Sequence, residues 1–212
     1  MEYALDNQFY MVKLRQWYLS QDDLEALRQL VRRVDHSLSD GFFPEYYSEG
    51  CEYRWIKGMV DNLLWGDKLH YAIDIDGKAV GCVNLSRCGG VYSRMGVLRL
   101  VLLPEMCGHG IGTQVVGRVA REAFMCYGHL STRFERIHAR VIGDNKAAVR
   151  VLEENGFVHE GTLRNAACKN NRTYDLKVYG LVNPEPEVST AKPLSQDQEE
   201  RIALIHKFLN QQ

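Results

Sequence analysis

The segment Cys107–Thr113 carries glycines at every second position, 108, 110 and 112, and lies between two elements of different character. The apolar stretch Leu98–Leu103 predicts a strand that ends before Pro104, and apolar residues that recur every four positions predict a helix over 110–127. Closely spaced glycines let backbone N–H groups converge, and the helix that follows adds unpaired amides and partial positive charge. Strand, loop and helix together therefore predict a backbone site for a phosphate or pyrophosphate group.

Two common nucleotide-binding loops do not fit this segment. Gly112 is followed by Thr113 and Gln114, so the Lys-Ser/Thr pair of nucleotide triphosphatases is absent. The G-x-G-x-G spacing and its late position in the chain also differ from the G-x-G-x-x-G fingerprint of dinucleotide sites. Glycines that only turn the chain remain an alternative, because a glycine motif alone is weak evidence.

The elements after the loop are predicted from alternation and from capping residues. Alternation over Arg136–Ile142 predicts a strand, and Asp144 or Asn145 then caps a helix that ends at Gly156. Two last strands form a closing hairpin, about Phe157–Ala166 and Thr173–Val182, on either side of the turn Lys169–Asn171.

The elements before the loop complete an α/β domain. We expect a strand at about 9–18, a helix capped by Ser20 that ends near 33–36, a helix at about 51–65, strands at 70–74 and 79–86 joined by a tight Asp76-Gly77 turn, and a strand at 95–103. The strand at 95–103 is apolar at consecutive positions, which is typical of a central strand that is covered on both faces.

Composition excludes several classes of protein. The chain has 212 residues, 45% of them hydrophobic, and a net charge of −1, so we expect one globular domain with no nucleic-acid partner. The run Val97–Leu103 is far shorter than a membrane span, and no basic-then-apolar segment follows Met1. The six cysteines and seven histidines show no metal-ligand spacing, so we expect reduced thiols, a cytoplasmic protein and no metal. Three of the five prolines fall within 183–196, which predicts a linker before a short helix at about 198–209.

The motifs resemble those of the GNAT N-acetyltransferase superfamily, and within it the RimJ/RimL-like branch. The resemblance rests on Leu102-Leu103-Pro104, on the loop Gly108–Thr113, on the block Asn145–Phe157 and on Glu160–Arg164, and it covers about residues 9–182. It implies a central, mostly antiparallel sheet flanked by helices, in which the fourth and fifth strands splay apart and leave a slot for acetyl-CoA. The implied domain is 1–182, with residues 183–212 as the linker and C-terminal helix.

The resemblance also implies which residues meet acetyl-CoA. The pyrophosphate loop maps onto Cys107, Gly108, His109, Gly110, Ile111, Gly112 and Thr113, and the strand edge that pairs with the pantetheine arm maps onto Leu100, Val101 and Leu102. Asn145 matches an asparagine that contacts the pantetheine arm, and the alternative for Asn145 is a plain helix cap. The side chain of His109 faces either the phosphates or the solvent.

The sequence departs from the family at the positions of chemistry. Cys107 replaces the usual Arg or Gln, which weakens charge assistance to the phosphates. Ala148 and Leu152 occupy the positions of the family's serine and tyrosine acids, so no general acid or base is assigned. A reactive thiolate at Cys107, activated by the helix N-terminus, is a remote alternative. Carboxylates in the segment that usually walls the acceptor site either attract a cationic amine or are plain surface groups: Glu45, Glu49, Glu52 and Asp61.

These inferences predict an acetyl-CoA-dependent N-acetyltransferase. An amine such as a protein N-terminus, a polyamine or another small amine would attack the thioester directly, with its carbonyl polarised by a backbone N–H near Leu102. Two alternatives stay open: a non-catalytic acyl-CoA-binding module that acts through a protein partner, and an enzyme with another phosphate-bearing donor. The acceptor, a homodimeric state and the role of the tail are not decided by the sequence.

Overall fold

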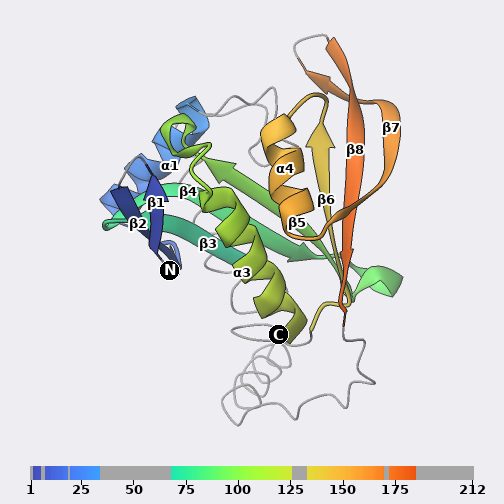
Figure 1. Ribbon diagram of the computed structural model, residues 1–212, viewed down its shortest axis with the longest axis horizontal. Helices are drawn as coiled ribbons and strands as arrows, with labels where there is room; N and C mark the ends of the chain where they lie inside the picture. Colours follow the sequence, from blue (N-terminus) through green and yellow to red (C-terminus); the bar gives the residue numbers. More distant parts are fainter. Residues whose placement is uncertain are drawn as a thin grey trace, which may run out of the picture.

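The structure is a computed structural model that describes residues 2–5, 8–18, 20–33, 68–125, 133–169 and 172–184. These residues form an eight-stranded sheet in the order β1-β2-β3-β4-β5-β6-β8-β7 (Figure 1). The strands are β1 (Glu2–Leu5), β2 (Gln8–Arg15), β3 (Lys68–Ile75), β4 (Lys78–Arg87), β5 (Met95–Leu102), β6 (Arg136–Ile142), β7 (Val158–Lys169) and β8 (Arg172–Val182). Only β5 and β6 pair in parallel, and all the other neighbours are antiparallel.

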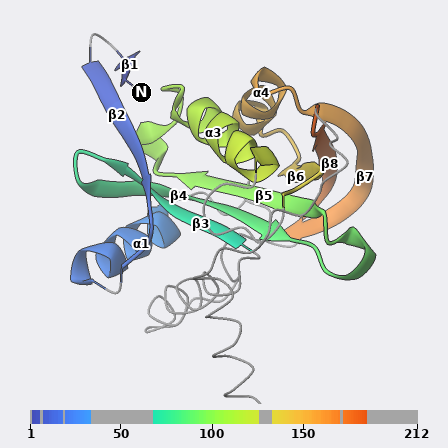
Figure 2. The same ribbon diagram turned by 90° about the horizontal axis from the view of Figure 1, so that it is seen from below.

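Three helices of the described residues cover the two faces of the sheet: α1 (Gln21–Arg33), α3 (Ile111–Met125) and α4 (Lys146–Glu154). Helices α3 and α4 lie on one face and α1 lies on the other (Figure 2). The predicted stripe of α3 is confirmed, because Ile111, Val115, Val119 and Ala123 are buried. The mixed α/β sheet that the sequence predicts is therefore the observed fold.

Local signals placed several boundaries correctly. Asp76 and Gly77 both have positive φ, 51° and 81°, which is the backbone of a two-residue hairpin turn between β3 and β4. The hydroxyl of Ser20 accepts a hydrogen bond from the Asp23 amide at 3.2 Å and so begins α1 as predicted. Strand β6 has the predicted bounds, and β8 ends at Val182, where the predicted domain ends.

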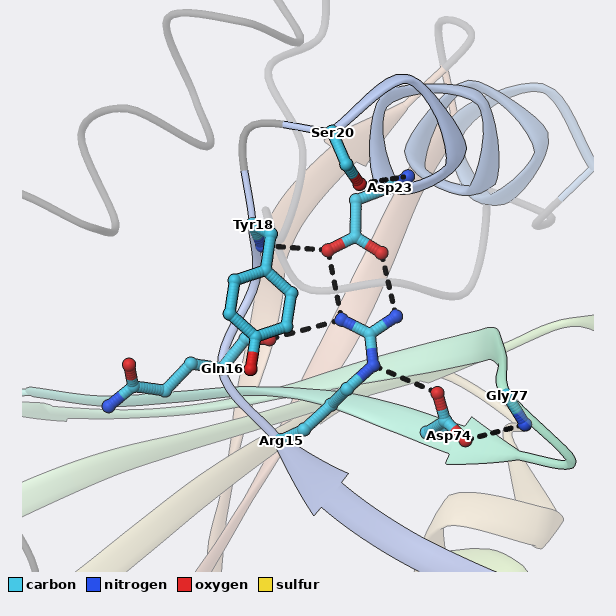
Figure 3. A network of polar contacts seen from close by, with 7 residues as sticks. All are labelled: Arg15, Gln16, Tyr18, Ser20, Asp23, Asp74 and Gly77. Atoms are coloured by element: carbon cyan, nitrogen blue, oxygen red, sulfur yellow. Dashed lines mark hydrogen bonds and ion pairs between the residues drawn. The ribbon is translucent and has the colours of Figure 1, made fainter.

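A polar network anchors α1 to the sheet. The guanidinium of Arg15, at the end of β2, donates to both carboxylate oxygens of Asp23 at 2.9 and 2.6 Å (Figure 3). Its Nε donates to Asp74 of β3 at 2.8 Å, and the Tyr18 amide donates to Asp23 at 2.7 Å. Both carboxylates are buried, Asp23 being 2% exposed, so one cation holds three elements together.

Strand β5 differs from its predicted environment. It lies near the centre of the sheet as expected, but only part of it is covered on both faces: Leu98 and Val101 are buried, whereas Leu100 and Leu102 are partly exposed. The reason is a cavity above the second half of the strand, which is described below.

Some features were not predicted, and others lie outside the described residues. Strand β1 and the short 3₁₀ helices at Gly90–Tyr92 and Pro104–Met106 were not expected. Strand β7 extends to Lys169 and contains register shifts at His159/Gly161 and at Leu163/Ala167. The helix predicted at 51–65 and the helix predicted at 198–209 lie outside the described residues, so the division into domain and tail stays a prediction.

Candidate functional site

Strands β5 and β6 separate after a short stretch of pairing. Their register covers only Met95–Val97 against Arg136–His138. Beyond that point a cavity of about 570 Å³ lies between the strands, bordered also by α3 and α4. Its apolar lining includes Leu98, Leu100, Ala139, Val141, Val151 and Leu152. A splayed strand pair with a slot, the feature that the resemblance implied, is present in this chain.

The slot edge of β5 presents backbone groups in every second residue. The backbone amide of Cys88 donates to the Met95 carbonyl at 2.8 Å, and the backbone amide of Leu103 donates to the Val80 carbonyl at 2.9 Å. The odd-numbered residues of β5 therefore form their backbone hydrogen bonds with β4. The N–H and C=O groups of Leu100 and Leu102 therefore point to the other side, where β6 has moved away. This edge can accept an extended ligand that carries amide groups, as a sheet accepts an added strand.

The glycine loop lies at the end of this edge. Gly108 and Gly110 have φ values of 82° and 72°, a left-handed conformation that favours glycine. The first hydrogen bond of α3 runs from the Gln114 amide to the Gly110 carbonyl at 3.2 Å. The amides of Ile111, Gly112 and Thr113 therefore precede the first helical bond and are oriented for an anion.

Most of the predicted loop and strand residues border the cavity, and two do not. The cavity is lined by Leu100, Val101, Leu102, Cys107, Gly108, Gly110, Gly112, Thr113 and Asn145. The His109 ring instead packs near Tyr10 of β2, with 6.4 Å between ring centroids, and Ile111 is fully buried in the core. For these two positions, a role in the site would come from the backbone amides, and that role stays a prediction.

Cys107 does not have the environment of a reactive thiolate. Its Sγ donates to the Leu103 carbonyl at 3.5 Å. Burial raises the pKa of the thiol above its ordinary value, and the nearby Glu105 carboxylate raises it further. This environment speaks against the remote alternative of a Cys107 thiolate, because partial desolvation of the thiol and the Glu105 carboxylate both raise its pKa.

Helix α4 supplies the opposite wall of the slot. Asn145 is its N-cap, with Oδ1 accepting the Ala148 amide hydrogen bond at 3.0 Å. Ala148 and Leu152 both border the slot, so the positions of the family's acids face the expected reaction centre with apolar side chains. The carboxylates of Glu45, Glu49, Glu52 and Asp61 lie outside the described residues.

A charged group at the mouth of the slot was not singled out from the sequence. Glu154 accepts hydrogen bonds from Arg150 Nε at 2.7 Å and from Thr113 Oγ1 at 2.9 Å, and both bonds lower the pKa of the Glu154 carboxyl. Lys146 and Arg150 also border the slot. The spacing of four between Lys146, Arg150 and Glu154 predicts a shared helix face and was the signal that could have found them.

Two absences are confined to the described residues. Within the described ranges, no cluster of His, Cys, Asp and Glu has the arrangement of a metal site. Among the helices that the structure describes, none is long and apolar enough to cross a membrane.

The comparisons with known proteins agree with this geometry. The model of the acetyltransferase (GNAT) domain matches residues 12–158. An uncharacterised N-acetyltransferase of Bacillus subtilis, YoaA, is 35% identical over 39% of this chain and 44% of its own length. The spermidine N(1)-acetyltransferase of Vibrio cholerae is 26% identical over 74% of this chain and 91% of its own length.

A solved structure extends the likeness to the fold. The ribosomal L7/L12 alpha-N-protein acetyltransferase RimL, solved with coenzyme A, superposes with a TM-score of 0.67 at 20% identity. The superposition covers 81% of this chain and 93% of RimL. At this identity the match concerns the fold.

Proposed function

The chain belongs to the acetyltransferase (GNAT) family, and from this premise we propose that the slot between β5 and β6 holds acetyl-CoA for transfer of the acetyl group to a primary amine. The observation that carries the proposal is the continuous row of unpaired backbone groups. It begins at Leu100 and Leu102 and ends at the glycine loop and the first amides of α3.

Each part of this row fits one part of acetyl-CoA. The pantetheine arm carries amides that pair with the free edge of β5, and the pyrophosphate accepts hydrogen bonds from the amides of Gly108–Thr113. Asn145 borders the slot, and we assign to its side chain the contact with the arm that the family resemblance implies. Lys146 adds positive charge beside the slot, whereas the charge of Arg150 is paired with Glu154.

The reaction proposed is direct attack of the amine on the thioester. Binding the acetyl group in a fixed place supplies proximity, and a backbone N–H of β5 polarises the carbonyl as negative charge develops on its oxygen. Ala148 and Leu152 leave no acid at their positions. A CoA thiolate is nevertheless a tolerable leaving group, because an ordinary thiol has a pKa of about 8.5.

The relatives support an amine acceptor without deciding which one. One acts on spermidine by its name, and the structural neighbour acts on the N-terminus of a ribosomal protein. Both acceptors carry a primary amine that must lose a proton before it attacks. We therefore propose a protein N-terminus or a small amine as the acceptor.

A non-catalytic acyl-CoA-binding module is the second candidate. It is favoured by the apolar side chains at 148 and 152, which border the slot where other members of the family carry an acid. Binding of acetyl-CoA does not separate the two candidates, whereas turnover does.

Mass spectrometry of an amine panel tests the proposal. The protein is incubated with acetyl-CoA and with spermidine, aminoglycosides, amino acids and short peptides with free Ser or Ala termini. We expect one class to gain an acetyl group at a rate proportional to enzyme concentration. Acetyl-CoA that raises the melting temperature while no amine is acetylated would favour the binding module, and acetyl-CoA that does not bind would contradict both.

A further inference from the structure

The inner end of the slot coincides with a histidine on β6. The last register pair of the two strands is Val97 with His138, and the slot begins at the next residues, Leu98 and Arg99 on β5 and Ala139 and Arg140 on β6. The glycine loop lies beyond the far end of β5. A ligand whose pyrophosphate is at the loop and whose arm follows β5 therefore brings its acyl end toward His138.

His138 lies on the face of the sheet that α3 and α4 do not cover. Successive side chains of a strand point to opposite faces, and Ala139 and Val141 line the slot with residues of α4. His138 and Arg140 therefore project to the opposite face, together with Arg99 of β5. Helices α3 and α4 lie on the first face, so we take the second face as the side from which an acceptor approaches (Figure 2).

In the part of the chain that the structure describes, one ring nitrogen of His138 is left without a hydrogen-bond partner. His138 is half-buried, and its Nδ1 is buried without a hydrogen-bond partner among the described residues. Burial lowers the pKa of His138, and the charges of Arg140, Arg136 and Arg99 lower it further, against a smaller opposite effect of Glu160. The environment therefore favours the uncharged form of the His138 side chain.

The carboxylate that acts on His138, Glu160, is paired with another residue. Glu160 of β7 forms an ion pair with Arg136. Gly180 of β8 is the register partner of His138, and a Cβ atom at Gly180 would overlap both members of this pair. The ion pair between Arg136 and Glu160 therefore crosses β8 over Gly180. Arg136 holds Glu160 in place near His138.

We propose that His138 accepts the proton that the ammonium group of the acceptor must lose before it attacks the thioester. This inference rests on the proposed function, because it needs acetyl-CoA in the slot. It adds the proton acceptor that the positions 148 and 152 do not supply.

One proton passes from R–NH₃⁺ to a nitrogen of His138, directly or through one water. The lone pair of R–NH₂ attacks the carbonyl carbon, so a C–N bond forms and the C–S bond breaks with its electron pair on sulfur. The nitrogen then loses a second proton to the thiolate, which leaves as CoA–SH, and His138 returns its proton to solvent.

The experiment compares His138→Gln with His159→Gln, a histidine of β7 that contacts Tyr179 and Thr162 outside the slot. Acetyl-CoA affinity is measured by calorimetry. The pH profile of kcat/KM is measured with the panel amine that the wild type acetylates fastest. We expect His138→Gln to bind acetyl-CoA normally, to lose about 100-fold or more in kcat/KM and to have the acidic limb of its profile moved to higher pH, where the amine loses its own proton. His159→Gln should keep the wild-type kcat/KM and the wild-type acidic limb.

A further variant tests the electrostatic environment. Arg140→Gln removes one of the charges that lower the pKa of His138, so the acidic limb should move to higher pH. A wild type that does not bind acetyl-CoA overturns the proposed function itself. A wild type that binds it and acetylates no amine of the panel, or a His138→Gln variant with unchanged kcat/KM and an unchanged acidic limb, overturns the role of His138 and leaves the cofactor site standing.

Discussion

Asn145 Oδ1 and the Ala148 amide are joined by a 3.0 Å hydrogen bond, so the residue that the family resemblance assigns to the pantetheine arm is also the cap of α4. The cap uses the oxygen of the side chain, and Asn145 also borders the slot. The two roles of Asn145 are therefore compatible and can be separated by substitution.

Asn145→Ser and Asn145→Ala separate the two roles. Serine keeps a capping oxygen, so we expect its free energy of unfolding to stay within a few tenths of a kcal/mol of wild type, whereas alanine should lose about 1 kcal/mol. Both variants should weaken acetyl-CoA binding about tenfold, the effect of one hydrogen bond. Urea unfolding and calorimetry measure the two quantities. Wild-type affinity in the serine variant would show that Asn145 is only a cap.

Gly110→Leu should remove acetyl-CoA binding. Gly110 has a φ of 72° and borders the slot, so a side chain both strains the loop and displaces the amides. We expect affinity to fall about 100-fold. Gly90→Leu is the matched control, because Gly90 has a φ of 62° and lies in an open turn away from the slot. Equal losses in the two variants would mean that backbone strain, and not the loop, is responsible.

Arg15→Met should destabilise the fold much more than Arg33→Met. Loss of Arg15 leaves the buried carboxylates of Asp23 and Asp74 without their cation, at a cost of about 3–5 kcal/mol. Arg33 makes a bidentate pair with Glu105 at similar distances, 2.8 and 2.9 Å, but both side chains are more than 40% exposed. Its loss should cost less than about 1 kcal/mol. Similar unfolding midpoints in urea would contradict this assignment.

Cys107 should react slowly with iodoacetamide. Because burial and Glu105 raise the pKa of the thiol, the reactive thiolate forms only at a higher pH than in an ordinary cysteine. At pH 7 we expect slower alkylation than in an unstructured cysteinyl peptide, measured by peptide mass spectrometry. Glu105→Gln should speed the reaction, and Cys107→Ser should keep acetyl transfer. Loss of transfer in Cys107→Ser would revive the thiolate alternative.

Local signals explain how much of the fold could be predicted. The Asp76-Gly77 turn, the Ser20 and Asn145 caps and the four-residue repeat of α3 each depend on neighbouring residues, and all are present in the structure. The register shifts of β7 and the pairing of β1 depend on contacts across the sheet. A single sequence does not reveal such contacts.

The candidate site likewise has features that could be predicted from the sequence and features that could not. Its backbone part was predictable, because glycines and a helix start are visible in the sequence. The raised pKa of the Cys107 thiol could not be predicted, because the helix N-terminus is a local feature and the desolvation that opposes it is not. His138 was overlooked because its place at the end of the β5–β6 pairing follows only from the topology.

Calorimetric titration of acetyl-CoA into a variant with a filled slot tests the central claim most directly. Ala148→Trp places an indole in the slot, and Glu153→Trp places the same group on α4 outside the slot lining. We predict saturable one-site binding to the wild type and to Glu153→Trp, and loss of measurable binding in a folded Ala148→Trp. Equal affinity in all three proteins would show that acetyl-CoA does not occupy the space between β5 and β6.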